Sequence, residues 1–231
     1  MTGHAAIPEG VDPESAALLR RAYDLKDVAE GQQLYREWAE SYDATMLDGL
    51  GYTAPRLLVE LFAHAAPARF GPILDLACGT GLVGAELAQR GFMPIDGVDL
   101  SRAMMDVAAR LGIYRSLIEA DLTGVLPFED RGYAAAICNG TFTSGHVDAS
   151  CLDEIVRVIA PGGLLACAVH HSVWEAQGFA DDQSADNGEH QGLMACNYSH
   201  VEQHPGIGEG EQGQHQIARA RLDMAQHPIG G

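Results

Sequence analysis

The chain has 231 residues, of which 47% are hydrophobic and 20% are charged, a composition typical of a soluble globular domain that buries its own core. Its formal net charge is −18, so it lacks the basic surface with which proteins bind phosphate backbones and anionic membranes. We therefore expect neither a nucleic acid nor a membrane among its partners.

The cysteines and the lack of a long apolar segment indicate the compartment. The five cysteines are far apart and include no C-x-x-C pair, which argues against a disulfide framework and against a zinc site. No apolar run approaches the ~20 residues of a membrane span, and the first residues do not resemble a secretory signal. These observations predict a cytoplasmic protein.

Three helices are predicted at the start of the chain, over residues 14–23, 31–46 and 55–65. In each stretch, apolar residues recur at the spacing of a helix with one buried face. In the second stretch this face is formed by Leu34, Trp38 and Tyr42. We interpret the face mainly as a packing surface, with a covering role over a ligand as a second function.

Short apolar strands alternate with helices in the middle of the chain. The strands are expected at 72–77, 93–99, 114–119, 133–139 and 164–170. Between them we expect a helix over 82–90, a helix capped by Ser101, and a helix that begins at Asp148 or Ser150 and ends at Pro161-Gly162-Gly163. This alternation predicts an α/β fold in which helices cover both faces of a mostly parallel sheet.

The composition changes near residue 181. Residues 181–231 contain no Phe or Trp, are rich in Gly and Gln, and show no strand alternation. We expect them to form an irregular or disordered tail that contributes no strand. The chain then divides into N-terminal helices over 1–66, a ligand-binding core over 67–180 and the tail over 181–231.

A glycine-rich turn joins the first predicted strand to the next helix, in the run Ile73-Leu-Asp-Leu-Ala-Cys-Gly-Thr-Gly-Leu-Val-Gly84. Gly79 and Gly81 have no Cβ, so a ligand can approach the backbone closely there. Asp99 follows Gly79 by 20 residues, at the end of the second strand, where an acid can bind ribose hydroxyls. The loop predicts a nucleotide-type cofactor, and the dinucleotide of an NAD(P)-type oxidoreductase is one candidate.

Three further features bear on the identity of the cofactor. Asp75 lies inside the first strand, where a buried acid is costly unless a ligand or the loop satisfies it. Asp121 and Leu122 follow the third strand, where a carboxylate can accept from an adenine amino group while an apolar side chain packs on the ring. A Pro161-Gly162-Gly163 turn precedes the fifth strand.

With these residues the chain resembles the class I S-adenosylmethionine-dependent methyltransferases over about residues 35–175. The run Gly140-Thr-Phe-Thr-Ser-Gly-His146-Val is more specific. Together with Tyr35-x-x-Trp38-Ala39-x-x-Tyr42-Asp43, it is similar to the methyltransferase-like proteins named after the Williams-Beuren syndrome chromosome region. The resemblance implies a Rossmann-like fold with an N-terminal helical lid and S-adenosyl-L-methionine as cofactor. The motifs say little about the substrate, and our first hypothesis is a small-molecule methyl acceptor.

The resemblance also implies a role for each part of the site. The glycine loop would contact the methionine end of the cofactor, Asp99 the ribose, and Asp121 with Leu122 the adenine. The end of the fourth strand would line the methyl-transfer side, and tyrosines of the N-terminal helices would cover the cofactor as a lid. The predicted cofactor-binding residues are Tyr35, Tyr42, Asp75, Ala77, Gly79, Gly81, Asp99, Leu100, Met104, Asp121, Leu122, Asn139 and Thr141.

His146 is the candidate catalytic base, because it follows the fourth strand at the edge of the sheet where ligands bind, and Asn139 is a second catalytic candidate. The alternative for His146 is a structural role in which it anchors its loop. His170-His171 does not predict a metal site, because neighbouring strand residues point to opposite faces of a sheet and no carboxylates accompany them.

The chain departs from the family after the fifth strand. Members usually continue into an antiparallel hairpin of two more strands, which the tail does not supply, so we expect an incomplete hairpin and an exposed edge on the fifth strand. A change of reading frame near residue 180 would produce such a break. Two alternative functions therefore stay open: an NAD(P)-type Rossmann oxidoreductase, and a cofactor-binding methyltransferase remnant with impaired catalysis.

Overall fold

The computed structural model describes residues 12–66, 71–143, 146–170, 173, 193–198 and 217–220. These residues form a seven-stranded sheet in the order β3-β2-β1-β4-β5-β6-β7, in which only β7 runs antiparallel to its neighbour. The predicted α/β class and mostly parallel sheet are therefore confirmed. The strands are β1 (Ile73–Leu76), β2 (Ile95–Asp99), β3 (Tyr114–Glu119), β4 (Tyr133–Phe142), β5 (Ile159–His170), β6 (Leu193–Tyr198) and β7 (Ile217–Ala220).

The order of the strands locates the place where a ligand can bind. Strands β1, β2 and β3 follow one another toward one side of the sheet, and β4 then pairs with β1 on its other side. The connections after β1 and β4 therefore leave the same edge of the sheet in opposite directions, which opens a crevice between them. This crevice brings the glycine loop after β1 close to the end of β4.

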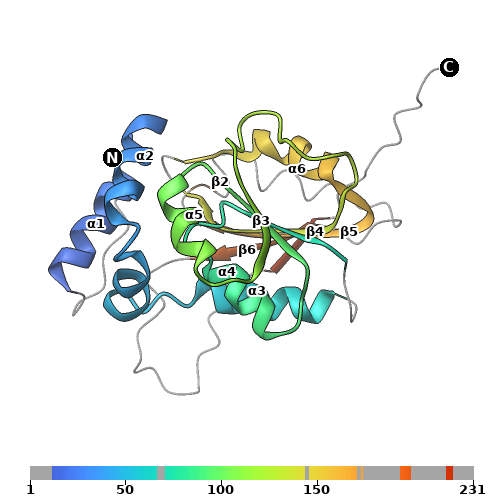
Figure 1. The fold of residues 1–231 in the computed structure, drawn as a ribbon, viewed down its shortest axis with the longest axis horizontal. Helices are drawn as coiled ribbons and strands as arrows, with labels where there is room; N and C mark the ends of the chain where they lie inside the picture. Colours follow the sequence, from blue (N-terminus) through green and yellow to red (C-terminus); the bar gives the residue numbers. More distant parts are fainter. Residues whose placement is uncertain are drawn as a thin grey trace.

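Helices cover both faces of the sheet, with α3 (Ala54–Ala65) and α4 (Leu82–Gln89) on one face and α6 (Leu152–Val158) on the other (Figure 1). Side chains alternate along β1, so Ile73 packs against α3 and α4 while Leu74 and Leu76 join the core beneath α6. Helix α5 (Arg102–Ala109) lies against β2 and β3. Ser101 caps α5 as predicted, since its Oγ accepts from the Met104 amide at 3.4 Å.

The N-terminal elements α1 (Pro13–Tyr23), α2 (Val28–Trp38) and the π-helical turn η1 (Ala44–Gly49) pack on one another beside the carboxyl edge of the sheet. The predicted helix over 31–46 is wrong in its length, because α2 ends at Trp38. There the Ser41 amide bonds back to the Trp38 carbonyl at 3.0 Å and the Thr45 hydroxyl donates to the Ser41 carbonyl at 2.9 Å. Such side-chain and short-range bonds compete with the helical pattern.

Two expectations about the C-terminal part of the sheet are wrong. Strand β5 begins at Ile159, before the Pro161-Gly162-Gly163 turn, and its register against β4 shifts between Tyr133 and Ala135. Strand β6 pairs in parallel with β5, and β7 pairs with β6, although no strand was expected in 181–231. The physical reason is that pairing uses backbone N–H and C=O groups, and the open edge of β5 offers a row of them to any extended segment.

Gly97 of β2 is a position where the packing of the sheet tolerates no side chain. A Cβ there would lie 2.7 Å from Leu117 Cδ2, 2.9 Å from Cys78 Sγ and 3.1 Å from Tyr114 Cε1. Gly31, in α2, is different, since its Cβ would meet only Leu25 Cδ1 at an ordinary 3.6 Å.

We predict that Gly97→Ala lowers the free energy of unfolding by ~1–3 kcal/mol, because the methyl group overpacks the site. The matched change Gly31→Ala should raise it by ~0.5–1 kcal/mol, because alanine stabilises a helix relative to glycine. Urea denaturation of the two variants measures both effects. Equal stability of the wild type and Gly97→Ala would contradict this account of β2.

Candidate active site

The glycine loop leaves β1 in a backbone conformation that glycine favours. The φ angles of Ala77, Gly79 and Gly81 are 50°, 54° and 96°, all in the left-handed region where an ordinary side chain such as that of Ala77 is strained. The Gly81 amide donates to the Cys78 carbonyl at 2.9 Å and closes the turn before α4 begins. The sequence thus correctly identified the residues at which the backbone turns sharply.

Asp99 lies at the end of β2 and joins this strand to the loop. Its Oδ2 accepts from the Gly79 amide at 2.8 Å, and its Oδ1 accepts from the Ser101 amide at 2.7 Å. Burial raises the pKa of the Asp99 carboxyl, and the bonds from Ser101 and Gly79 act in the opposite direction. Each oxygen keeps lone pairs for a further donor, so the carboxylate fits the hydroxyls of a ribose.

Asp75 and Tyr114 form a buried pair beneath the loop. The Tyr114 hydroxyl donates to Asp75 Oδ2 at 2.7 Å, and no partner of Asp75 Oδ1 is found among the described residues. Asp75 is 1% exposed, and burial raises its pKa to about 7, against the effect of the Tyr114 hydrogen bond and with a smaller contribution from the charge of Asp99. A Cβ on Gly84 would lie 2.2 Å from the Tyr114 hydroxyl, so the third glycine of the motif makes room for this tyrosine.

The residues predicted to hold the adenine lie near the ends of β2 and β3. Asp121 Oδ1 accepts from the Thr123 amide at 2.8 Å and from the Thr123 hydroxyl at 2.7 Å, which fixes the turn after β3. Met104 and Leu122 are 3% and 6% exposed. The Met104 methyl group lies close to the loop, 3.7 Å from where a Gly79 Cβ would be. Leu122 packs in the core beneath α6, so its contact with a base stays a prediction, as does that of Leu100.

A small cavity, here called the aromatic cavity, lies between the N-terminal helices and the end of β4. Its volume is about 30 Å³. Trp38 and Tyr42 make an edge-to-face contact with ring centroids 4.8 Å apart, and Tyr35 stacks near Trp38 at 6.2 Å. No partner of the buried Trp38 Nε1 is found in the described part of the chain. The cavity is lined by Leu19, Ala22, Tyr23, Tyr35, Trp38, Tyr42, Met46, Tyr52, Gly140, Thr143 and His146.

His146 is held at this cavity by two hydroxyl groups. Its Nε2 lies 2.9 Å from the Tyr35 hydroxyl and its Nδ1 lies 2.8 Å from the Thr143 hydroxyl. A neutral imidazole has one N–H donor and one acceptor nitrogen, so one hydroxyl donates to the ring and the other accepts from it. The structure therefore gives His146 an anchored position, and a proton can reach it through the Tyr35 hydroxyl.

Asn139 and Thr141 lie on the last part of β4. The Asn139 Nδ2 donates to the Tyr52 hydroxyl at 2.8 Å, and no partner of its Oδ1 is found among the described residues. Thr141 is 7% exposed. The end of β4 is thus joined to the aromatic cavity through Tyr52. Contacts of Asn139 and Thr141 with a ligand stay predictions.

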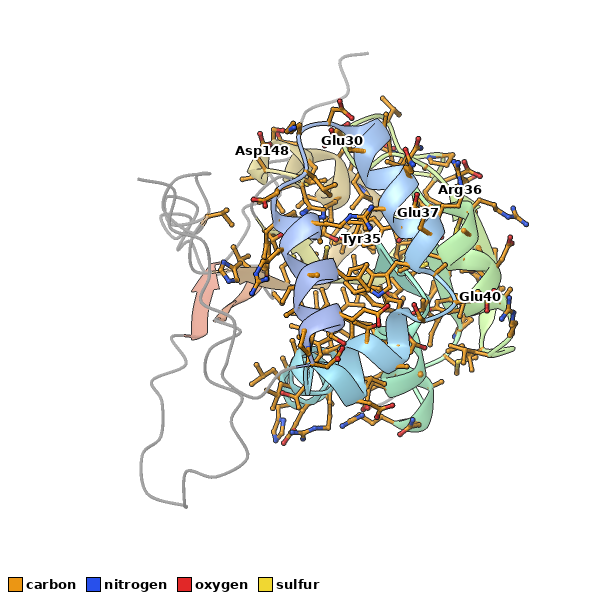
Figure 2. The ribbon with its side chains drawn as sticks, turned by 90° about the vertical axis from the view of Figure 1, so that its left-hand side faces the viewer. Glu30, Tyr35, Arg36, Glu37, Glu40 and Asp148 are labelled. Atoms are coloured by element: carbon orange, nitrogen blue, oxygen red, sulfur yellow. The ribbon has the colours of Figure 1, made fainter. Side chains whose placement is uncertain are left out.

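Side chains fasten the N-terminal helices to the core on the side shown in Figure 2. The Thr80 hydroxyl of the glycine loop donates to Asp43 Oδ1 at 2.5 Å. The Arg110 guanidinium after α5 donates to both oxygens of Glu40, at 2.8 and 2.6 Å. Figure 2 shows Glu30, Glu37, Glu40 and Asp148 on this face around Tyr35. The predicted lid therefore has specific contacts with the loop that it would cover.

Sequence reasoning missed several residues that the structure brings to the site, namely Tyr23, Tyr52, Tyr114 and Thr143. One signal was present, because four of the seven tyrosines lie in the first 52 residues. Tyr114 gave no such signal. Its hydroxyl reaches Asp75 across Gly97, a relation that depends on the register of three strands.

Within the described residues, no group of three or more His, Cys, Asp or Glu side chains is placed to hold a metal ion. His170 is buried at the end of β5, and His171 lies outside the described residues. Among the described helices, none combines the length and the apolar character that a membrane span needs. Cys78, Cys138, Cys151 and Cys167 are buried free thiols, and the side chain of Cys196 lies outside the described residues.

Comparison with known proteins gives one family for the core of the chain. Residues 73–163 match the family model described as a methyltransferase domain. This range contains the glycine loop, Asp99, Asp121, the end of β4 and the Pro161-Gly162-Gly163 turn.

Relatives agree with this match, and one solved structure shares the fold. Human methyltransferase-like protein 27 is 38% identical over 162 residues, which cover 66% of this chain and 63% of that protein. YqeM of Bacillus subtilis strain 168, provisionally named as a methyltransferase, is 31% identical over 163 residues, covering 68% of this chain and 63% of YqeM. The chain thus spans less than two thirds of these relatives. The [4+2]-cyclase SpnF, at 22% identity, shares the fold with a TM-score of 0.51 over 62% of this chain and 60% of its own.

The raised pKa of Asp75 predicts a pH dependence of stability. The unfolded carboxyl titrates near 3.8 and the folded one near 7, so the folded state binds more protons between these values. The free energy of unfolding should therefore fall as the pH rises from about 4 to about 7, with a slope of up to ~1.4 kcal/mol per pH unit from this group. Asp75→Asn should remove this component, while its amide oxygen still accepts from Tyr114.

Denaturant unfolding of the wild type and Asp75→Asn at a series of pH values between 4 and 8 tests this dependence. Asp106→Asn is the matched control, because Asp106 is exposed on α5 and should leave the slope unchanged. If wild type and Asp75→Asn lose stability equally steeply over this range, Asp75 does not titrate as described.

Proposed function

Because this chain contains a class I S-adenosylmethionine-dependent methyltransferase domain, we propose that it transfers a methyl group from S-adenosylmethionine to a small-molecule acceptor. The observation that carries the proposal is the junction of the glycine loop, Asp99 and the aromatic cavity at the crevice between β1 and β4. The family match favours this function over an NAD(P)-type oxidoreductase with the same loop.

The residues present fit the cofactor. A Cβ at Gly79 would meet only Met104 Cε, at 3.7 Å, and Asp99 keeps free lone pairs beside this glycine, as a ribose site needs. Asp121 and Met104 lie near the strand ends where the base would bind, and Tyr35 and Tyr42 line the aromatic cavity. When bound, S-adenosylmethionine supplies a methyl group on a positively charged sulfur, which a nucleophile displaces in line.

The chain's own contribution to the reaction is alignment, exclusion of water and a route for a proton. The aromatic cavity opens beside the end of β4, so it would hold the reacting part of the acceptor. Tyr35 lines this cavity and its hydroxyl contacts His146 Nε2. We assign His146 as the group that receives the acceptor's proton through Tyr35, and Thr143 as the residue that fixes the imidazole. Asn139 positions Tyr52.

A small acceptor is supported by the size of the cavity and by the acidic charge of the chain, which disfavours nucleic acid substrates. A cytoplasmic location stays a proposal that rests on the scattered cysteines.

Calorimetric binding of S-adenosylmethionine tests the function. We expect the wild type to bind it and Asp99→Asn to bind about 10- to 100-fold more weakly, because a hydrogen bond to a charged group contributes ~1.5–3 kcal/mol. The exposed Asp106→Asn should bind like the wild type.

Three results would contradict the proposal or support an alternative function. No binding of S-adenosylmethionine by the wild type would contradict the proposal, and binding of NAD(P) in its place would support the oxidoreductase. Binding of S-adenosylmethionine without methylation of any compound in a metabolite extract would support an impaired remnant.

A further inference from the structure

The lining of the aromatic cavity indicates which chemical group of an acceptor it suits. Its wall carries the rings of Tyr23, Tyr35, Trp38, Tyr42 and Tyr52, and no Lys, Arg, Asp or Glu side chain is among the described residues that line it. A carboxylate or phosphate placed inside would lose its hydration without gaining a cationic partner, which is costly. The cavity therefore selects against an acceptor whose buried part is an anion.

Negative charge lies behind and around the aromatic wall. Asp99 and Asp43 both contribute, after burial and the neighbouring tyrosines, to the raised pKa of Tyr42, so their fields reach its ring. Outside, the acids Glu30 and Asp148 are exposed on the face around Tyr35, where Arg36 is exposed as well (Figure 2). Aromatic faces and nearby carboxylates together attract a cation such as an ammonium group.

The size of the cavity further limits which chemical groups it can hold. A volume of about 30 Å³ admits a group of the size of one or two water molecules. An amino head group fits this space. Trp38 lines the cavity, and its buried Nε1 has no partner among the described residues.

We propose that the aromatic cavity binds the amino head group of the methyl acceptor, which makes the acceptor a primary or secondary alkylamine. The inference rests on the proposed methyl transfer and names the substrate class of that site. The cavity is separate from the predicted ribose and adenine contacts, because Gly79, Asp99 and Asp121 are not among its lining residues. Tyr35 and Tyr42 line the cavity and are also predicted cofactor contacts, so the cavity would adjoin the cofactor site and share these two side chains with it.

The reaction balances with the groups present. The ammonium group first gives one proton through the Tyr35 hydroxyl to His146 Nε2, which leaves a nitrogen lone pair. This lone pair forms the new N–C bond to the methyl carbon. The S–C bond breaks with its electron pair remaining on sulfur, so the products are S-adenosylhomocysteine, the N-methylated ammonium ion and a protonated His146.

The test uses n-propylammonium and 1-propanol, which have the same number of heavy atoms and differ in charge. Their binding to the full chain without cofactor is followed at neutral pH by NMR, with propionate and p-cresol as further probes. We expect n-propylammonium to bind about 2- to 30-fold more tightly than 1-propanol, the range of a cation over aromatic rings. Propionate and p-cresol should bind more weakly than n-propylammonium.

Variants at Tyr23 locate the binding, because Tyr23 lines the cavity from α1 and is not a predicted cofactor contact. Tyr23→Leu removes the ring and should reduce the preference for n-propylammonium over 1-propanol at least about 2-fold. Tyr23→Phe keeps the ring and should retain the preference. The comparison of the four probes on the wild type stands even if Tyr23→Leu does not fold.

Equal binding of n-propylammonium, 1-propanol and p-cresol would overturn the inference, since the cavity would then be merely apolar. Displacement of n-propylammonium by S-adenosylhomocysteine would also overturn it, because the cavity would then belong to the cofactor. Separate titration with S-adenosylmethionine distinguishes the two proposals. If the protein binds S-adenosylmethionine but shows no preference for n-propylammonium, the proposed function stands and this inference is wrong. If it prefers n-propylammonium but does not bind S-adenosylmethionine, the proposed function is wrong and the amine preference of the cavity stands.

Discussion

The hydrogen bond from the Gly79 amide to Asp99 Oδ2 is the interaction on which the site depends. It joins the loop after β1 to the end of β2, at the point where the sheet reverses its winding. The amide can point at the carboxylate only because the backbone at Ala77, Gly79 and Gly81 adopts positive φ angles. The same bond satisfies a carboxylate that burial would otherwise destabilise.

The three aspartates of β1 and β2 differ in their hydrogen-bond donors and in the direction of their pKa shifts. Asp96 is bound by Arg115 Nε at 2.9 Å, Ser116 Oγ at 2.8 Å and Tyr133 Oη at 2.9 Å, so despite burial its pKa is lowered. Asp75 and Asp99 are bound in the structure by uncharged donors, and burial raises their pKa values. Burial thus disfavours the charged forms of the two acids near the crevice, and a cationic ligand bound beside them would favour these forms.

The N-terminal helices are part of the site as well as a cover for it. They carry most of the aromatic wall, and Tyr35 connects them to His146 of the β4 connection. Asp43 connects them to Thr80 of the glycine loop. Because one set of helices touches both the loop and the proposed proton route, its position would couple the enclosure of a cofactor to the alignment of an acceptor.

The sequence by itself determined the alternation of strands and helices, the glycine loop and the acid that follows it, because these depend on periodicity and on backbone conformations that only certain residues adopt. It also led to the methyltransferase family through Asp75 to Gly81, Asp99 and Asp121. The tertiary structure alone decided the end of α2, the pairing of β6 with β5, the Tyr114–Asp75 contact and the aromatic cavity. These features join residues far apart in the chain, and pairing along a strand edge uses backbone groups that carry no sequence signal.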